Sequence, residues 1–396
     1  MSAGRTGNDA IAPYKSLQSL SSSTAGYLLG DGQSTFYYPS RLDSPDLSWE
    51  TTDLYNAGLD IAVLKGRLKF TLEGYLSYTK DLLLSVQKAQ QTGYGSYTRN
   101  LGRTSNKGVE LSIESRNIVK KNFSWTTELT LSRNVQMVED IGGEQEVVAM
   151  KDPDKGYMMY GYKAGYPLNS LWGFQYGGVW HNREEIADND ITHQYVDFYA
   201  KPYKCGRPKY VDQNHDGLLN NDDLVYLGNA DPVVYGGFQN NFHIFGFDLG
   251  IYFSYSIGGR IYNYSEFFMA GTYAANQYRY MLNAWHPYRN PESDYPAAGA
   301  SGYSMLPSDF LVHDASYLRL KTVSLSYLFD LTKKVKWIRS ISVGVSGENL
   351  WLLTNYNGFD PDVSSVVSDQ ESTVRRADIG AYPRPLKVIA TVQLKF

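Results

Sequence analysis

The chain has 396 residues, of which 34 are Tyr, and its formal net charge is −4. Its 37 basic and 41 acidic residues leave no basic footprint of the kind that nucleic-acid-binding proteins show. The single cysteine, Cys205, excludes an internal disulfide and a cysteine-based metal cluster. No apolar run approaches the ~18 residues of a membrane helix, so a helical membrane protein is excluded as well.

Apolar and polar residues alternate in segment after segment along the chain. Leu68, Phe70 and Leu72, for example, alternate with polar residues. A period of two with one apolar face predicts β-strands. The phase changes near Lys321, which predicts a β-bulge or a shifted register there. We predict eleven strands, and a twelfth if residues 3–10 contribute one, near residues 57–64, 67–80, 107–118, 123–137, 157–163, 169–180, 234–245, 247–258, 316–329, 339–351 and 384–396.

The links between these strands alternate strictly between tight and long. The long links have roughly 20 to 57 residues, against the ~4 to 6 that are typical of compact domains. Outer-membrane barrels have short periplasmic turns and long extracellular loops. The fold class that we predict is therefore all-β, a transmembrane antiparallel β-barrel with its tight turns on the periplasmic side. The predicted tight links are 65–66, 119–122, 164–168, 246 and 330–338.

The end of the chain gives the clearest predicted strand. Val388, Ala390, Val392, Leu394 and Phe396 fall on one face, and mainly polar residues fall on the other. A barrel strand places its apolar face toward lipid, its polar face toward the lumen and an aromatic residue at the interface. The long loops and the lack of a signal peptide at the start favour the carboxy-terminal half of a larger barrel.

One loop has a definite chemical pattern. Residues 212–223 follow the spacing of a calcium loop, with Gly217 at the sharp turn and a carboxylate at the last position. An Asx-rich turn that holds no metal is the alternative. The loop lies in the link 181–233, which we expect on the extracellular side. The predicted ligands of one structural Ca²⁺ are Asp212, Asn214, Asp216, the carbonyl group of Leu218, and Asp223.

Aromatic residues gather in two of the predicted extracellular links. Exposed aromatic side chains stack on sugar rings or contact a partner protein, whereas buried ones pack loops against each other, and both readings stay open. No catalytic constellation is present in the sequence, so we do not expect an enzyme. The aromatic residues are Tyr195, Phe198, Tyr199 and Tyr203 in one link and Tyr262, Tyr264, Phe267, Phe268, Tyr273, Tyr278, Tyr280, Trp285 and Tyr288 in the other.

Several short segments, in one order and spacing, carry a family resemblance. They are residues 4–8, 45–52, 165–168, 172–174, 212–223 with 227–228 and Pro232, 314–321, 349–350, 356–361 and 382–385. Together they make the chain similar to the SusC/RagA group of TonB-linked (TonB-dependent) outer-membrane transporters of Bacteroidetes-type bacteria. The resemblance implies a 22-stranded barrel, plugged by an amino-terminal domain and energised by TonB-ExbB-ExbD through that amino-terminal part.

The same resemblance implies partners and cargo. A SusD-like surface lipoprotein would cap the barrel, and the pair would import glycans (oligosaccharides) or peptides. Residues 1–396 would form the carboxy-terminal part of the barrel, with the plug domain and the signal peptide absent. We expect the links 181–233 and 259–315 to form part of the docking face for the lipoprotein, because they are long and rich in aromatic residues.

Two other classes of protein remain as alternatives. A secreted, calcium-stabilised, carbohydrate-binding β-sandwich would also account for the tyrosines and the acidic loop. It predicts short connections and apolar faces that turn inward against each other. A small autonomous porin-like barrel is the second alternative.

Overall fold

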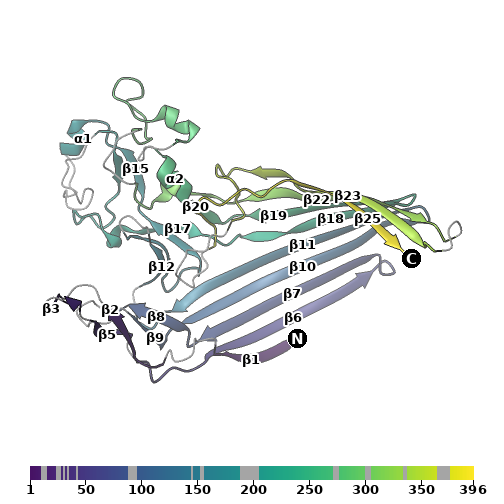
Figure 1. Cartoon of the computed structure of the whole chain (residues 1–396), viewed down its shortest axis with the longest axis horizontal. Helices are drawn as coiled ribbons and strands as arrows, with labels where there is room; N and C mark the ends of the chain where they lie inside the picture. The colour runs from purple at the N-terminus through teal and green to yellow at the C-terminus, as the bar shows by residue number, and fades with distance from the viewer. Residues whose placement is uncertain are drawn as a thin grey trace.

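The computed structural model describes residues 1–9, 16–23, 28–29, 32–33, 35–41, 43–87, 96–143, 146–151, 156–187, 205–270, 276–298, 305–332, 337–363 and 375–396. Its main feature is one antiparallel sheet of ten strands, seen on the right of Figure 1. In sheet order the strands are β1 (Ser2–Asn8), β6 (Glu50–Val63), β7 (Leu68–Lys80), β10 (Arg103–Lys120), β11 (Phe123–Asp140), β18 (Val234–Ile244), β19 (Phe247–Ile257), β22 (Tyr317–Asp330), β23 (Ser340–Thr354) and β25 (Lys387–Lys395).

One face of this sheet is apolar. Directly paired residues of an antiparallel sheet lie on the same face, so the register shows the composition of each face. Ile61 pairs with Phe70, Phe70 with Ile113, and Ile113 with Leu129. The row continues from Leu129 to Phe238 on the next strand. Rows of this kind confirm the predicted alternation.

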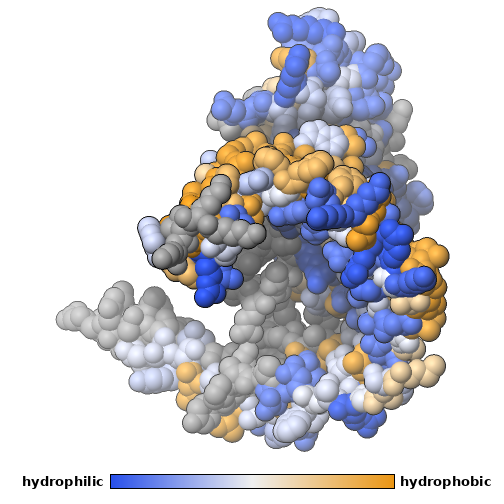
Figure 2. Space-filling model, turned by 90° about the vertical axis from the view of Figure 1, so that its right-hand side faces the viewer, coloured by the Kyte–Doolittle hydropathy of each residue, from blue (hydrophilic) through white to orange (hydrophobic). Residues whose placement is uncertain are grey.

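The opposite face is polar. Thr71 pairs with Asp60 and with Ser112. In the next row of the same face, two residues along β7, Lys69 lies directly opposite Glu114. The Lys69 ammonium and the Glu114 carboxylate form an ion pair at 2.9 Å. Figure 2 shows the sheet end on as an open arc, with polar residues toward the hollow and hydrophobic residues along the outer rim on its right-hand side. The polar face is therefore the concave, luminal face.

Tight turns join neighbouring strands at one end of the sheet, and the chain finishes at the same end (Figure 1). The turn between β18 and β19 consists of Phe245 and Gly246, whose φ angles are 48° and 90°. Two consecutive positive φ angles define a type I′ hairpin, whose twist matches that of the flanking strands. All the long links leave the opposite end, so the predicted alternation of tight and long links along the sheet is confirmed.

Two of the predicted barrel strands are wrong. Residues 157–163 and 169–180 contain β13 (Met158–Tyr162) and β14 (Ser170–Gly173), which belong to a separate four-stranded sheet. The predicted tight link 164–168 therefore lies inside a long link. These short strands are rich in apolar residues because they are buried in protein, as all of Ser170–Gly173 are. Their apolar residues made them look like strands that face lipid. The predicted strand at 3–10 is confirmed as β1, so the described main sheet has ten strands.

The phase change near Lys321 is a β-bulge, as predicted. Between Leu320 and Thr322 the register of β22 shifts against β23. The pairing of β22 with β19 shifts at the same level, between Tyr252 and Phe253. Against β19 Lys321 is the extra residue, and it returns the following residues of β22 to the correct faces of the sheet. Against β23 it lies opposite two residues, Asn349 and Leu350.

The long links on the left of Figure 1 fold together into a second body, which we call the loop lobe. It consists of the described residues of the links 141–233, 258–316 and 355–386. Its sheets are β12 (Val147–Lys151)-β13-β14-β17 (Val225–Asn229), β15 (Tyr176–Val179)-β16 (Pro208–Tyr210) and β21 (Val312–Asp314)-β20 (Arg260–Asn263)-β24 (Ala377–Asp378). Its short helices are α1 (Arg183–Ala187), η2 (Asn221–Asp223), α2 (Tyr264–Met269), η3 (Arg279–Asn283) and η4 (Asp309–Leu311).

A smaller group of strands follows β1 and β7. It consists of β2 (Ser19–Ser23), β5 (Phe36–Arg41), β9 (Ser96–Asn100) and β8 (Leu83–Gln87), with the two-stranded pair β3 (Leu28–Leu29) and β4 (Gly32–Gln33) beside it in the chain. No helix in the described part of the chain is long and apolar enough to cross a membrane.

The two alternative folds are not what the structure shows. β1 and β25 are the edges of the described sheet and do not pair with each other, so a small closed barrel is absent from it. On the apolar face Leu59 and Val392 are 54% and 67% exposed, so no second sheet covers them in the described residues. A β-sandwich would bury both residues between its sheets.

Candidate functional site

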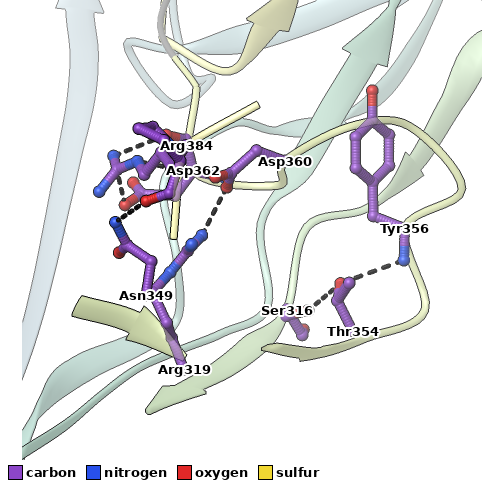
Figure 3. Close-up of polar contacts among 9 residues, drawn as sticks. Ser316, Arg319, Asn349, Thr354, Tyr356, Asp360, Asp362 and Arg384 are labelled. Atoms are coloured by element: carbon purple, nitrogen blue, oxygen red, sulfur yellow. Dashed lines mark hydrogen bonds and ion pairs between the residues drawn. The ribbon is translucent and has the colours of Figure 1, made fainter. Parts of the chain in front are cut away.

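Arg319 lies near the start of β22, directly after the loop-lobe link 258–316 (Figure 3). We call this end of the sheet, where the strands meet the loop lobe, the mouth. Arg319 stands on the luminal face of β22, since its neighbours Leu318 and Leu320 pair within the apolar rows. Its guanidinium donates to the Asp360 carboxylate at 2.6 Å, and the two side chains are 4% and 3% exposed. A buried ion pair of this kind is strongly destabilised when one partner is removed. The link after β23 is therefore fastened to β22.

Arg384 extends this network toward solvent. Its guanidinium lies 3.6 Å from the Asp360 carboxylate and 2.8 Å from that of Asp362. On the same side Asn349 donates its side-chain amide to the carbonyl oxygen of Pro385 at 3.1 Å (Figure 3). These contacts fix the segment that leads into β25. The last strand is thus placed by polar contacts at its start as well as by pairing along its length.

Arg376 joins the three links of the loop lobe. Its guanidinium donates to the hydroxyl of Ser256 at 2.6 Å and to the carbonyl of Gly258 at 3.0 Å. Its own carbonyl accepts from the hydroxyl of Tyr160 and from the backbone N–H of Tyr262, both at 3.0 Å. Burial lowers the pKa of Arg376 below its ordinary value. One residue thus connects the links 141–233, 258–316 and 355–386 at the end of β19.

A pocket of about 320 Å³ lies at this mouth, and we call it the mouth pocket. In this pocket the Asp231 carboxylate forms an ion pair with Arg375 at 3.1 Å and accepts a hydrogen bond from the side-chain amide of Asn169 at 2.8 Å. Acidic, basic and amide groups therefore converge on the same small space, which suits a ligand with polar groups of both charges. The lining residues are Asn134 and Tyr235 from the luminal face of the sheet and Ala230, Asp231, Pro232, Asp362, Val363, Arg375 and Arg376 from the loop lobe.

A second pocket, of about 750 Å³, opens in the loop lobe. Tyr176, Tyr295 and Phe310 form an aromatic wall, and the ring centroids of Tyr176 and Phe310 are 4.9 Å apart. Polar side chains such as those of Asn290 and Glu292 complete the rim. Aromatic faces next to polar groups suit both sugars and polar peptides. We call this second pocket the lobe pocket.

Glu266 is the carboxylate of helix α2, and it is buried. It accepts a hydrogen bond from the hydroxyl of Tyr280 and lies 2.5 Å from Nε2 of His313. Nearby, the hydroxyl of Tyr356 donates to Asp378 at 2.6 Å. Burial, with the Asp378 carboxylate beside it, raises the pKa of Tyr356. These groups satisfy one another, so they hold α2, η3 and β21 together instead of facing a ligand.

The predicted calcium loop folds as a series of tight Asx turns. The Asp212 carboxylate accepts backbone N–H groups from His215 and Gly217, each at 2.8 Å. The buried Asp223 carboxylate accepts from Gln213 at 2.9 Å and from Asn220 at 2.7 Å. Burial raises the pKa of Asp223, whereas the N–H donors outweigh burial and lower the pKa of Asp212.

The loop supplies only oxygen ligands, which is the set that Ca²⁺ prefers. Asp216 hydrogen-bonds Asn214 on the exposed side of the loop, at 3.0 Å. Across the described ranges no three His, Cys, Asp or Glu side chains form a group that is ready to hold a metal. The predicted set also relies on Asn214 and on the carbonyl of Leu218, so calcium binding here stays a prediction.

The described aromatic residues of the link 259–315 from Tyr262 to Tyr288 are buried, partly buried or exposed, and Tyr278, Tyr280 and Trp285 are the partly buried ones. Tyr262, Tyr264 and Phe267 are buried in the core of the loop lobe, with Met159 and Leu311. They pack loops against each other and cannot anchor a partner without unfolding the lobe. The exposed members are Phe268 and Tyr288. The aromatic residues Tyr195, Phe198, Tyr199, Tyr203 and Tyr273 lie outside the described residues.

The ion network at the mouth was not predicted from the sequence. Its members come from three of the segments that carry the family resemblance: Arg319 lies in 314–321, Asp360 in 356–361 and Arg384 in 382–385. The one sequence signal for this network was that each of these three matching segments contains a charged residue. Figure 3 shows that these residues lie close together. They do so because the link after β23 folds back over the start of β22.

Comparisons with known proteins agree with this architecture. Residues 2–179 match the family described as TonB dependent receptor-like, beta-barrel. The chain is 30% identical to the TonB-dependent receptor P26 of Formosa agariphila over 99% of this chain and 39% of that receptor. It is 28% identical to the TonB-dependent receptor SusC of Bacteroides thetaiotaomicron over 97% of this chain and 35% of SusC. The chain thus spans less than half the length of the curated relatives that it matches.

Among solved structures, the RagAB peptide transporter superposes on the whole chain with a TM-score of 0.77. The match covers 40% of that chain at 24% identity, which establishes a shared fold. These matches define the class of protein: over nearly its whole length the chain is similar to the β-barrel portion of TonB-dependent receptors, which are outer-membrane proteins. Within that class its homologues are SusC-like over nearly the whole chain.

Proposed function

We propose that the whole protein to which this barrel portion belongs imports glycans (oligosaccharides) or peptides across the outer membrane. TonB-ExbB-ExbD energises the import through the amino-terminal part, and a SusD-like surface lipoprotein delivers the cargo. The observation that carries the proposal is the mouth pocket, where the loop lobe meets the luminal face of the sheet. A polar pocket at the entrance of a barrel is where a hydrophilic cargo first contacts the channel wall.

The comparisons support this proposal at the level of class. SusC-like receptors align with nearly the whole chain, and the RagAB peptide transporter shares its fold. The charges of Asp231 and Arg375 in the mouth pocket suit the amino and carboxyl groups of a peptide, and the aromatic wall of the lobe pocket suits a sugar ring. Both cargo classes therefore stay within the proposal.

Uptake measurements test the cargo site. A strain that lacks the gene is complemented with the whole receptor and with a variant that carries Asp231→Asn and Arg375→Gln, and uptake of radiolabelled oligosaccharides and peptides is compared. We expect the uptake of the variant to fall at least about tenfold, because the loss of even one charged hydrogen bond, worth about 1.5–3 kcal/mol, corresponds to that factor. Glu184→Gln, at an exposed position of helix α1 outside both pockets, is the matched control. Unchanged uptake of every cargo by the double variant would exclude the mouth pocket.

The docking face that we propose for the lipoprotein is smaller than the whole of the links 181–233 and 259–315, and only the exposed residues of the second link belong to it. A deletion of 262–288 would remove the buried Tyr262 and Phe267 and so collapse the loop lobe. Leu282 and Tyr288 are 80% and 91% exposed and lie in the same link. Exposed apolar residues of this kind serve as anchors at protein interfaces.

Co-purification tests this docking face. Leu282→Ser together with Tyr288→Ser should lower the amount of lipoprotein that co-purifies with the whole receptor, while the barrel still assembles. Leu64→Ser is the matched control, since Leu64 is 69% exposed at the tight-turn end of the sheet. Full retention of the lipoprotein by the double variant would move the docking face away from this link.

A further inference from the structure

A groove of about 990 Å³ runs across the apolar, lipid-facing side of the sheet near β1. The surface is hollowed here because the small residues Ala57 and Gly74 occupy positions where neighbouring rows carry large side chains. A Cβ atom at Gly74 would find no heavy atom closer than the Gly108 carbonyl oxygen at 4.0 Å. The walls of the groove are formed by the apolar or aromatic side chains of Tyr55, Leu76, Val109 and Val135.

Two basic residues, Lys107 and Arg133, line one end of this groove. In the register of β10 and β11, Lys107 pairs with Val135 and Val109 with Arg133. Lys107 and Arg133 are therefore diagonal neighbours on one face, about 7–8 Å apart at the backbone. Both are exposed, and within the described residues neither forms an ion pair, in contrast to Lys80, which lies 3.4 Å from Asp53.

These two cations lie at the outer boundary of the lipid-facing band. Arg133 is ten residues from the start of β11 at the tight-turn end. At about 3.3 Å per residue and a tilt of about 40°, it stands about 25 Å above that end, which matches the height of the apolar band of outer-membrane barrels. A cation on the lipid face is unfavourable deeper in the membrane but can meet lipid headgroups at this level.

We propose that the groove binds one phosphorylated lipid of the outer leaflet. The lipid phosphate lies between Lys107 and Arg133, and an acyl chain lies over Ala57, Gly74 and Val109. Arginine presents a planar fork of donors that matches phosphate, and lysine adds a second point charge. The apolar floor favours a lipid over free phosphate, because a free anion gains nothing from it.

This inference does not depend on the transported cargo. It follows from the register, the groove and the charges of the lipid-facing side, whereas the proposed import function depends on the luminal side. The floor of the groove lies on β6, β7 and β10, each of which pairs on both sides in the described sheet.

The test uses the whole receptor, extracted from the outer membrane in mild detergent and analysed by native mass spectrometry. Purified monophosphoryl lipid A is the probe, phosphatidylcholine is the zwitterionic control lipid, and inorganic phosphate is the competitor. The double variant Lys107→Gln with Arg133→Gln removes both charges, and Gly74→Val fills the floor while leaving the charges in place. Lys120→Gln, on the same strand at the tight-turn end, is the matched control.

We expect the wild type and Lys120→Gln to retain one monophosphoryl lipid A per receptor. The double variant should retain at least about tenfold less, since each cation near a membrane surface contributes about fivefold to the binding of anionic lipid. Gly74→Val should lose lipid even though its charges are intact, and phosphatidylcholine should not be retained. Equal retention by all variants, or displacement of the lipid by inorganic phosphate, would overturn the proposal.

Discussion

In the ten-stranded sheet Leu59 and Leu72 are 54% and 44% exposed, whereas in the loop lobe Leu171, Leu311 and Met159 are completely buried. Both regions consist of β-strands joined by turns, yet their apolar residues face different surroundings. The sheet presents its apolar rows outward to lipid, which needs no protein partner. The loop lobe instead encloses a dry core, as a water-soluble domain does. The boundary between the two runs through the Arg319 network at the mouth.

The largest effect is expected at that boundary. Asp360→Ala leaves the Arg319 guanidinium buried without its charged partner and should destabilise the mouth by about 3–5 kcal/mol. Asp362→Ala removes a half-exposed ion pair with Arg384 and a hydrogen bond with Tyr317, so it should cost less, about 1–2 kcal/mol. Hydrogen exchange of the lobe end of β22, measured on the whole receptor, reports both changes. Equal costs for the two variants would show that the mouth is wet and that the two regions are not separate.

The sequence predicts the two regions unequally well, for a physical reason. Barrel strands are half exposed to lipid and half to the lumen, so residues such as Leu68 to Leu72 alternate with a period of two. The lobe strands β13 and β14 are buried on both sides but have only five and four residues, which is too short for their pattern to distinguish them from barrel strands. Their assignment depends on contacts with β12 and β17, which the sequence alone does not specify.

The same distinction between local patterns and long-range contacts decides which parts of the candidate site could be predicted from the sequence. The bulge at Lys321 could be predicted, because it changes the phase of a local pattern. The pairing of Arg319 with Asp360 could not, since 41 residues separate them and an entire strand lies between. Aromatic residues such as Tyr262 and Tyr288 could be located from the sequence. Their division into buried and exposed groups depends on how the three links pack.

A matched pair of leucines sharpens the comparison between the regions. Leu171→Ala in the core of the loop lobe should cost about 2–5 kcal/mol, because it leaves a cavity that the packed surroundings cannot fill. Leu72→Ala on the lipid-facing side leaves a gap that lipid fills, so its cost should stay below about 1 kcal/mol. Thermal unfolding of the whole receptor in detergent, followed by loss of the folded band on a gel, compares the two. Similar costs would mean that both leucines are packed in protein.

Calcium binding would add a third contribution, confined to the loop lobe. If the loop 212–223 holds Ca²⁺, a hundredfold excess over the dissociation constant should stabilise the lobe by about 2.7 kcal/mol. Asp216→Ala should abolish that gain, and Asp222→Ala, at an exposed position outside the predicted ligand set, should preserve it. Titration calorimetry of the whole receptor and its stability in a chelator measure the effect. Absence of calcium heat, with Asp216→Ala unchanged in stability, would make the loop a turn only.

The smallest effect is expected within the luminal face of the sheet. Lys69 and Glu114 form an ion pair at 2.9 Å, but their side chains are 44% and 35% exposed. Glu114→Gln should therefore cost less than about 1 kcal/mol, and the cost should fall further at high salt, because water and ions screen exposed charges. The buried pair at Asp360 should show almost no such salt dependence. A loss near 3 kcal/mol for Glu114→Gln, independent of salt, would mean that the luminal wall is as dry as the mouth, so that charge burial no longer distinguishes the sheet from the loop lobe.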